Sequence, residues 1–526
     1  MQLVQESKYV SGEDDSELRG ILRNRTLTGI YQSATWQYHR YGINCKLSGS
    51  VYAASEIEGA VPLLHGPAGC SFHQRLTPMK IYAPIYDLPS TNLDENDVIY
   101  GGENKLREKI NEVYQKFHPS LIVLLPTCIS GLIGDDIPGL CQDIKPDLPC
   151  DLVHVASEGF AHRSRESLDG LMEDTAKSWK TSRPPDYDLR GCGQEEVILS
   201  LVNQLMEEQD VVENLVNIET FGRFRYGSRK DLQEIKRIFA EMGIVVNMTI
   251  PSCTVEEIKR APAAKLNIVT RNRKAAKRMN EKFGTDYYRK WASHYGMDGI
   301  ESFFLEVASK LNLDGVAEEV IKREKIKALE DLSKYRRNFG QHDFAVSTQG
   351  FFFTPYFARI FVQDLGLPIK YFCVNTQLLR SMNTSEKTIG SMMKNLEDLF
   401  ADWDFRFEMV VNPTANEMSE IAKKVDYMLS DRIMPFLCKN GNEISMMDIS
   451  SISNLLFRTS FTGIVEFARH FADALDNRHR DRKRLPIISR FAYDQINYPL
   501  IEDPRCSASR VMWQDMWSLK SAAGVD

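Results

Sequence analysis

The stretch LIVLLPTCISGLIGDD, residues 121–136, joins an apolar run of strand length to a turn of small and polar residues. Leu121 to Leu125 form the apolar run, and Cys128 opens the turn. In a sheet of parallel strands, the strand ends deliver side chains to a crevice at one edge. The stretch therefore predicts a buried strand that carries Cys128 to such an edge.

Two other cysteines, Cys45 and Cys70, also lie in turns, and Cys70 closes the sequence LHGPAGC at residues 64–70. The intervals between the three cysteines are 25 and 58 residues, so only a folded domain brings their thiols together. Turns hold metal-binding thiolates so that their sulfur atoms converge, whereas a structural cysteine needs no such setting. We expect Cys45, Cys70 and Cys128 to bind a metal centre.

The glycines of these turns have two interpretations. Gly66, Gly69 and Gly131 allow the backbone to approach inorganic sulfur closely, where a Cβ atom would clash. The alternative is that Gly66 and Gly69, with Pro67 between them, form only a tight turn between a strand and a helix.

Polar residues follow Cys128. Asp135 and Asp136 are expected to cap the next helix, and orienting the thiol is their alternative role. Ser130 lies two residues beyond Cys128 and is a candidate auxiliary ligand.

A zinc site would require a fourth ligand, for which His65 or His73 is available, but the short ligand spacings of structural zinc are absent. Three cysteines do not complete a large cluster, so we expect the remaining ligands to come from another chain. The other cysteines are interpreted as structural, apart from Cys253, which is discussed below: Cys141, Cys150, Cys192, Cys373, Cys438 and Cys506.

The composition is that of a globular protein. The chain has 526 residues, 43% hydrophobic and 26% charged, so two to four domains are expected. The net charge of −7 gives no reason to expect nucleic acid. The sequence contains neither an apolar run of membrane-spanning length nor a signal peptide, and its ten cysteines form no CxxC pairs, so we expect a cytoplasmic protein in a reducing compartment.

Strand-length apolar runs alternate with helical periodicity along the chain, which predicts an α/β fold of three Rossmann-like parallel-sheet domains with a helical and extended C-terminal segment. The expected divisions are an N-terminal arm (1–35), a cluster-binding domain (36–190), a second domain (191–337), a third domain (338–440) and a C-terminal helix with a subunit-contact arm (441–526).

The segments HGPAGC and TCISGLIGDD, with INCKLSGSVYAASEIEG at residues 43–59, resemble the nitrogenase component 1 superfamily. The resemblance implies that Cys45, Cys70 and Cys128 bind half of an iron–sulfur P-cluster of the 8Fe-7S type. A homologous catalytic subunit would bind the other half, in a heterodimer or heterotetramer. No P-loop for ATP occurs in the chain, and the resemblance implies that a separate ATP-hydrolysing iron–sulfur protein delivers electrons.

The resemblance also bears on a second metal centre. The positions at which catalytic subunits hold their larger iron–sulfur cofactor fall on or near Arg271 and Ser450, which do not replace the family's cysteine and histidine. The partner subunit is therefore expected to hold that cofactor. Cys253 is the nearest substitute ligand, and its alternative role is to cap a helix over residues 255–261.

These features favour a β-type subunit of a nitrogenase-like, ATP-dependent reductase, with no catalytic residues of its own. Among branches of the family, the methylthio-alkane reductases, which cleave carbon–sulfur bonds, fit a chain that keeps the cysteines but departs elsewhere. The alternatives are a subunit that reduces dinitrogen, a relative that reduces tetrapyrroles, a scaffold for cofactor assembly without turnover, and an α/β protein without a cluster.

Overall fold

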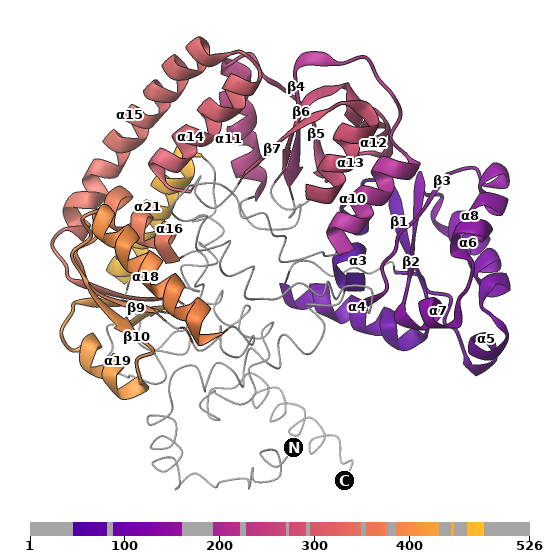
Figure 1. Ribbon diagram of the computed structural model, residues 1–526, viewed down its shortest axis with the longest axis horizontal. Coiled ribbons are helices and arrows are strands. Elements are labelled where there is room, and N and C mark those ends of the chain that lie inside the picture. Colours follow the sequence, from indigo (N-terminus) through magenta and orange to yellow (C-terminus); the bar gives the residue numbers. More distant parts are fainter. Residues whose placement is uncertain are drawn as a thin grey trace, which may run out of the picture.

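The computed structural model shows helices surrounding three separate parallel sheets, which form an arc from the first sheet through the second to the third (Figure 1). The structure describes residues 46–81, 88–159, 193–220, 228–269, 273–290, 295–348, 354–374, 376, 385–430, 443–445 and 460–477. The expected α/β fold class is therefore confirmed. Among the described helices, none is long and apolar enough to cross a membrane.

The first sheet contains three parallel strands in sequence order: β1 (Ala60–His65), β2 (Leu121–Pro126) and β3 (Asp151–His154). Every residue of β2 is buried, as expected for a central strand covered on both faces. The helices of this unit are α3 (Lys46–Glu56), α4 (Ala68–Ile81), α5 (Glu95–Tyr100), α6 (Glu103–Phe117), α7 (Cys128–Ile133) and α8 (Ile137–Ile144).

The second sheet has the order β5-β4-β6-β7, and all of its pairings are parallel. Its strands are β4 (Val212–Thr220), β5 (Val245–Pro251), β6 (Ala264–Val269) and β7 (Asp286–Arg289). Its helices are α10 (Gly193–Gln204), α11 (Ser228–Glu241), α12 (Val255–Lys259) and α13 (Arg273–Phe283).

The third sheet has the order β10-β9-β8-β11-β12. Its strands are β8 (Phe344–Thr348), β9 (Ile369–Val374), β10 (Glu408–Val411), β11 (Tyr427–Ser430) and β12 (Glu443–Ser445). The surrounding helices are α14 (Met297–Lys310), α15 (Asp314–Phe339), α16 (Thr354–Arg359), the π-helical turn η7 (Ile360–Asp364), α18 (Glu386–Asp402), α19 (Ala415–Ala422) and α21 (Phe461–Asn477).

The C-terminal segment 441–526, for which a helix is expected, contains α21, and Ile464, Phe467, Phe471 and Leu475 are buried along this helix at helical spacing. The same segment also contains a strand that the sequence analysis does not predict, because β12 pairs with β11 and extends the third sheet. A strand of three residues is too short to show a periodic pattern.

The first and second units share one hydrophobic core. α10 packs against α3 so closely that a Cβ atom on Gly193 would lie 1.9 Å from the carbonyl oxygen of Lys46. At the other end of the interface, the backbone N–H of Glu58 donates to the carbonyl of Cys253 at 2.9 Å. The position of the first sheet is therefore tied to the second.

A buried carboxylate caps α14 from a distant part of the chain. Asp364, at the end of η7, accepts a hydrogen bond from the backbone N–H of Met297 at 3.0 Å, where the N-cap Gly296 has no side chain to do so. Burial raises the pKa of Asp364 to about 7, against the opposing effects of that hydrogen bond and of the charge of Arg359. Asp298, also nearby, raises the pKa further, and Arg336 lowers it.

We predict that Asp364→Asn becomes more stable relative to the wild type as the pH rises from 5 to 7. Below pH 7 the native carboxyl keeps a proton that the unfolded chain, with a pKa near 3.9, releases, so wild-type stability falls as the pH rises through this window. The asparagine does not titrate and keeps an acceptor for Met297. The relative gain should be about 2–3 kcal/mol in the free energy of unfolding, measured by urea denaturation.

The matched control is Asp402→Asn, because Asp402 is exposed at the end of α18. Its stability relative to the wild type should not change over the same pH range. An equal pH dependence in the two variants would contradict the role given to Asp364.

Candidate metal-cluster site

The carboxyl edge of the first sheet carries the turns of Cys70 and Cys128. β1 and β2 are parallel and in a register that pairs His65 with Pro126, so both strands end at the same level. Cys70 is the third residue of α4, which follows β1, and Cys128 is the first residue of α7, which follows β2. The predicted delivery of Cys128 by a buried strand is what the structure shows.

The two turns pack directly against each other. The backbone N–H of Thr127 donates to the carbonyl of His65 at 3.0 Å. A Cβ atom on Gly66 would lie 2.1 Å from Oγ1 of Thr127, so only glycine fits at this position. By contrast, a Cβ atom on Gly69 would meet nothing within 4 Å among the described residues. Gly66 thus serves packing between the turns, while open space adjoins Gly69 beside Cys70.

The loop after β3 completes the same edge. The hydroxyl of Ser157 donates to the carbonyl of Pro126 at 2.7 Å, and the backbone N–H of Gly159 donates to Sγ of Cys128 at 3.2 Å. A backbone N–H that points at sulfur stabilises a thiolate and tunes the potential of an iron–sulfur centre. All three strands of the sheet therefore contribute to the surroundings of Cys128.

Ser130 has a structural role in this arrangement. Its side chain is fully buried, and its hydroxyl lies 2.9 Å from the carbonyl of Thr127 and 3.0 Å from that of His65. Because a hydroxyl has one proton, it donates to one of these carbonyls at a time. The hydroxyl therefore links the two turns to each other.

The described cysteines differ in exposure. Cys70, Cys128 and Cys150 are partly exposed, whereas Cys141, Cys253 and Cys373 are buried. Burial raises the pKa of the Cys141 thiol to about 11 and that of Cys373 to about 12, so both are protonated near neutral pH. Metal binding requires the thiolate, which burial in apolar surroundings disfavours. This contrast supports the interpretation of Cys141 and Cys373 as structural.

Cys150 and Cys253 also have raised thiol pKa values because of burial, to about 11 for Cys150. Cys253 lies within the core shared by the first and second units. The helix that it was expected to cap is α12, which ends at Lys259 and has Thr254 as its N-cap, with a reciprocal bond from Glu257. The capping role predicted for Cys253 therefore belongs to its neighbour.

Several residues of the prediction lie outside the described part of the chain. Cys45 immediately precedes the first described residue, Lys46, at the start of α3. The remaining ones are Cys192, Arg271, Cys438, Ser450 and Cys506.

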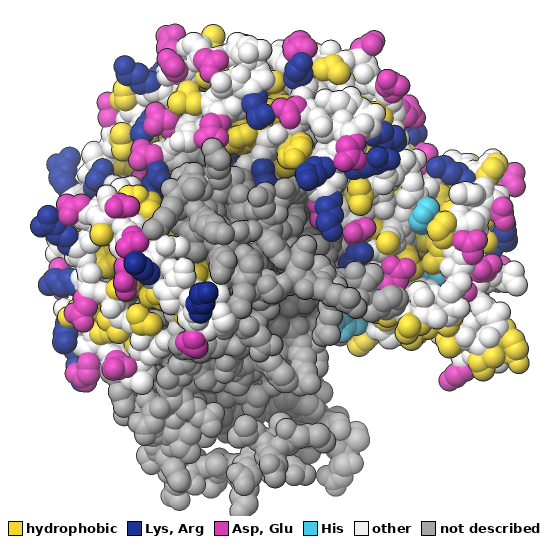
Figure 2. Space-filling view, in the orientation of Figure 1, with side chains coloured by type: hydrophobic (Ala, Val, Ile, Leu, Met, Phe, Trp, Pro, Cys, Tyr) yellow, Lys and Arg dark blue, Asp and Glu magenta, His cyan; other side chains and the backbone are white. Residues whose placement is uncertain are grey.

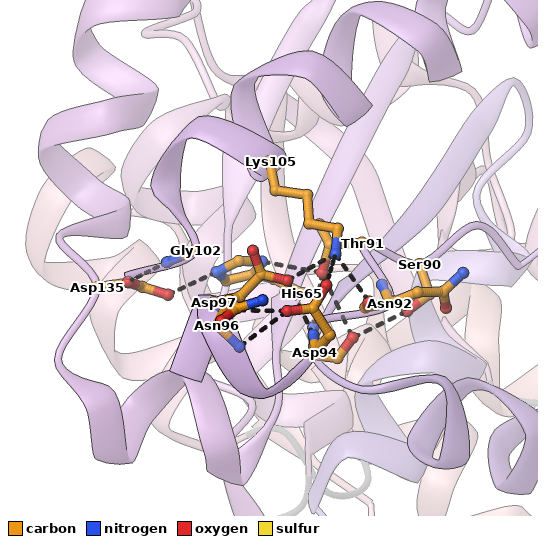
Figure 3. A network of polar contacts seen from close by, with 11 residues as sticks. His65, Ser90, Thr91, Asn92, Asp94, Asn96, Asp97, Gly102, Lys105 and Asp135 are labelled. Atoms are coloured by element: carbon orange, nitrogen blue, oxygen red, sulfur yellow. Dashed lines mark hydrogen bonds and ion pairs between the residues drawn. The ribbon is translucent and has the colours of Figure 1, made fainter. Parts of the chain in front are cut away.

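A buried histidine–carboxylate pair, which the sequence analysis did not identify, joins the end of β1 to the segment after α7 (Figure 3). Nε2 of His65 lies 2.8 Å from Oδ2 of Asp135, and the two side chains are 0% and 3% exposed. Thr91 Oγ1 lies 3.1 Å from Nδ1 of His65 and accepts the backbone N–H of Gly66 at 3.0 Å. The backbone N–H of Gly102 donates to Oδ1 of Asp135 at 3.0 Å.

Burial lowers the pKa of His65, although the hydrogen bond and the charge of Asp135 oppose the shift. The imidazole is therefore neutral near pH 7, and its Nε2–H donates to the carboxylate, since an ionised carboxylate only accepts. Nδ1 is then the acceptor for the hydroxyl of Thr91. The network joins the end of β1 to the segment that follows α7 and to the start of α6.

The two adjacent aspartates have different roles. Asp136 is the N-cap of α8, where its carboxylate accepts the backbone N–H of Gly139 at 3.0 Å. The predicted capping role is thus correct for Asp136 and wrong for Asp135, which accepts from His65 and Gly102 instead.

The residues at this edge fit an iron–sulfur centre. Cys70 and Cys128 are partly exposed, Sγ of Cys128 accepts a backbone N–H, and a Cβ atom on Gly69, beside Cys70, would meet none of the described residues within 4 Å. Oγ1 of Thr127, next to Cys128, is buried and has no hydrogen-bond partner among the described residues. No group of three or more His, Cys, Asp or Glu side chains converges as a metal site within the described residues.

Parallel α/β sheets that present ligands beyond their strand ends are typical of proteins that bind a cofactor or metal centre at that edge. Comparison with known proteins defines the group further. The chain belongs to the family of nitrogenase component 1 type oxidoreductases, whose pattern matches residues 45–476. The match begins at Cys45.

Two relatives illustrate the range of the family. The chain is 27% identical over 345 residues to the nitrogenase molybdenum-iron protein alpha chain of Methanosarcina barkeri, covering 62% of this chain and 55% of that protein. It is 29% identical over 350 residues to the nitrogenase iron-molybdenum cofactor biosynthesis protein NifE of Methanococcus maripaludis, covering 64% of each. The matched part thus spans less than two thirds of these relatives' length.

The fold also matches a solved structure, described as nitrogenase Cp1 at pH 6.5, with a TM-score of 0.53 and 17% identity over 84% of this chain and 90% of that one. At this identity the match supports the fold alone.

We predict that Asp135→Asn destabilises the protein by about 1–3 kcal/mol, because the amide turns one donor toward the N–H of His65 or of Gly102. The free energy of unfolding from urea denaturation at pH 7.5 measures the effect. Asp143→Asn is the control, since Asp143 is 73% exposed on α8, and it should change stability little. Equal stability of the two variants would show that the pair does not hold the turns.

Proposed function

We propose that this chain is the β-type subunit of a nitrogenase-like, ATP-dependent reductase and holds half of a P-cluster through Cys45, Cys70 and Cys128. The observation that supports the proposal most strongly is the meeting of the Cys70 and Cys128 turns at one sheet edge, with both thiols partly exposed. A partner subunit of the same family supplies the remaining ligands and the catalytic metallocofactor.

Once bound, the cluster supplies one-electron chemistry at low potential. The chain's own residues prepare the site for it. The N–H of Gly159 stabilises negative charge on the sulfur of Cys128. The N-terminal end of α4, fourteen residues long, favours negative charge near Cys70. The His65–Asp135 pair holds the two turns together without adding a net positive charge, because the imidazole is neutral.

An exposed apolar surface beside the Cys128 turn suits the docking of the electron donor. Ile99 and Tyr100 on α5 are 69% and 85% exposed, and Leu132 on α7 is 72% exposed. Figure 2 shows hydrophobic side chains gathered where Figure 1 places α5. We call these three residues the α5–α7 patch. Apolar surface of this kind marks protein interfaces, and we assign it to the ATP-hydrolysing iron–sulfur protein.

α5 is held firmly enough to present such a surface. Asp94 caps it through a reciprocal capping box with Asp97. From α6, Nζ of Lys105 binds Asp97 at 2.6 Å and Asp94 at 3.2 Å. The patch therefore stands on a short helix anchored at its N-terminus.

For the substrate we propose methylthio-alkanes, whose carbon–sulfur bond the complex cleaves reductively. The proposal rests on the departure at Arg271 and Ser450 from the usual cofactor ligands in a chain that keeps the three cysteines. Dinitrogen is the alternative substrate.

A second candidate function is a scaffold on which a metallocofactor is assembled without turnover. The similarity to NifE, at 29% identity over 64% of the chain, favours it. The exposed cysteine turns suit either function, and turnover distinguishes them.

We predict that Cys70→Ala removes most of the iron from the complex and abolishes product release, because it deletes a thiolate of the cluster. The chain is to be purified anaerobically with the proteins encoded beside it, and iron content and ethylene or methane release from methylthio compounds measured with ATP. Cys141→Ala should retain both, because Cys141 is buried in the α8 core.

The outcomes separate the proposals. Turnover of dinitrogen alone would replace the methylthio-alkane assignment, and iron binding without any turnover would support the scaffold. Equal iron content in the Cys70 and Cys141 variants would refute the cluster site itself.

We predict that Tyr100→Ala combined with Ile99→Ala lowers the rate of electron delivery roughly tenfold or more at limiting reductase, since exposed aromatic anchors carry much of an interface's energy. Iron content should be unchanged, because the α5–α7 patch contains no ligand. The control is Val316→Ala on α15, 49% exposed and remote from the edge. A normal rate in the double variant would exclude the patch as the docking surface.

A further inference from the structure

A polar cavity of about 340 Å³ lies beside the cysteine turn, outside the proposed cluster site. Its walls are the first part of α4, the segment 88–92 and the second half of α6. The segment is fixed to the edge of the first sheet, because the N–H of Leu64 donates to Pro89 and the N–H of Thr91 donates to Leu64. Two helices and a loop segment hydrogen-bonded to β1 therefore define the cavity.

The charge lining this cavity is predominantly positive. Arg75 from α4 and both Lys109 and Lys116 from α6 line it, and among the described lining residues Glu112 alone is acidic. Glu112 is 60% exposed and binds Nζ of Lys109 at 2.8 Å, a solvent-accessible pair that leaves the net charge of the lining positive. Cations that converge on a concave surface attract small anions.

Two of the cations have contacts with neighbouring groups. The guanidinium of Arg75 donates to the carbonyl of Leu88 at 2.9 Å, which uses one of its five N–H groups. Nζ of Lys116 lies 5.0 Å from the centre of the Phe117 ring. Because an arginine has further N–H groups and a lysine three, both retain donors for a ligand.

Buried hydroxyls add neutral donors to the wall. Ser71 and Ser90 are 5% and 6% exposed, and among the described residues their hydroxyls make only long contacts. The Ser71 hydroxyl lies 3.4 Å from the carbonyl of Leu88, and the Ser90 hydroxyl lies 3.3 Å from the carbonyl of Gly66 and accepts the backbone N–H of Asn92 at 3.3 Å. Hydroxyl hydrogen bonds are typically 2.7–2.8 Å long. These two hydroxyls are therefore weakly engaged and can rotate toward an occupant of the cavity.

The geometry points to a binding site for a small oxyanion with two negative charges, such as a phosphate group or a dicarboxylate. The volume accommodates a ligand of this size together with water. The three cations and two hydroxyls of the described lining are hydrogen-bond donors, and they outnumber the acceptor carboxylate of Glu112. An apolar ligand would leave these groups without partners. The site does not depend on the cluster, since none of the described cysteines lines it.

The test is calorimetric titration of the full-length protein with inorganic phosphate, and separately with succinate, against chloride at equal ionic strength. We expect saturable binding of one anion per chain for at least one of the two probes. Lys116→Gln should weaken binding roughly tenfold, the value of one charge-assisted hydrogen bond, and Arg75→Gln should do the same.

Arg107→Gln is the matched control, because Arg107 lies on α6 outside the cavity and pairs with Asp143 at the surface. It should bind like the wild type. Binding indistinguishable from chloride for both probes would overturn the proposal, and so would an equal loss in Lys116→Gln and Arg107→Gln. Circular dichroism measures the folding of each variant. Lys116 is exposed, so Lys116→Gln should fold and still tests the site if Arg75→Gln does not fold. Iron content tests the cluster separately.

Discussion

The parallel pairing of β1 and β2 is the constraint on which the proposed site depends. The register that sets His65 opposite Pro126 ends both strands at one level, and the contact between Gly66 and Thr127 then brings their turns together. A slip by one residue would turn every side chain of a strand to the opposite face and would end the two strands at different levels. The two cysteine turns are therefore positioned by hydrophobic burial of the strands that precede them.

The buried His65–Asp135 pair is fully hydrogen-bonded. Removing His65 and Asp135 from water is costly, and hydrogen bonds offset the cost. Nε2 of His65 and Oδ2 of Asp135 bind each other, while Thr91 is the partner of Nδ1 and Gly102 is the partner of Oδ1. Because the imidazole of His65 is neutral, the carboxylate of Asp135 is the charged member of the pair. At structural cysteines such as Cys373, apolar burial raises the thiol pKa and keeps the thiol protonated.

The sequence predicts the parts of the site that depend on local pattern. The apolar run from Leu121 predicts β2 and its delivery of Cys128, and the polar pair after it predicts the cap at Asp136. The sequence does not predict the His65–Asp135 contact, because these residues are 70 positions apart and meet only through strand register. The sequence also does not predict β12, because a strand of three residues is too short to show a pattern. It does not predict the capping of α14 by Asp364, because Asp364 lies 67 positions from Met297.

The cluster edge also depends on the second unit. α3 begins at Lys46, the residue after Cys45, and it is held between the first sheet and α10 by the close approach that Gly193 permits. Any larger residue at Gly193 would push α3 away from α10, because the obstacle is the backbone carbonyl of Lys46, which has no rotamer to adopt. The start of α3 is thus fixed by packing with a helix of the next unit, and the two units must fold together before a cluster can be held at this edge.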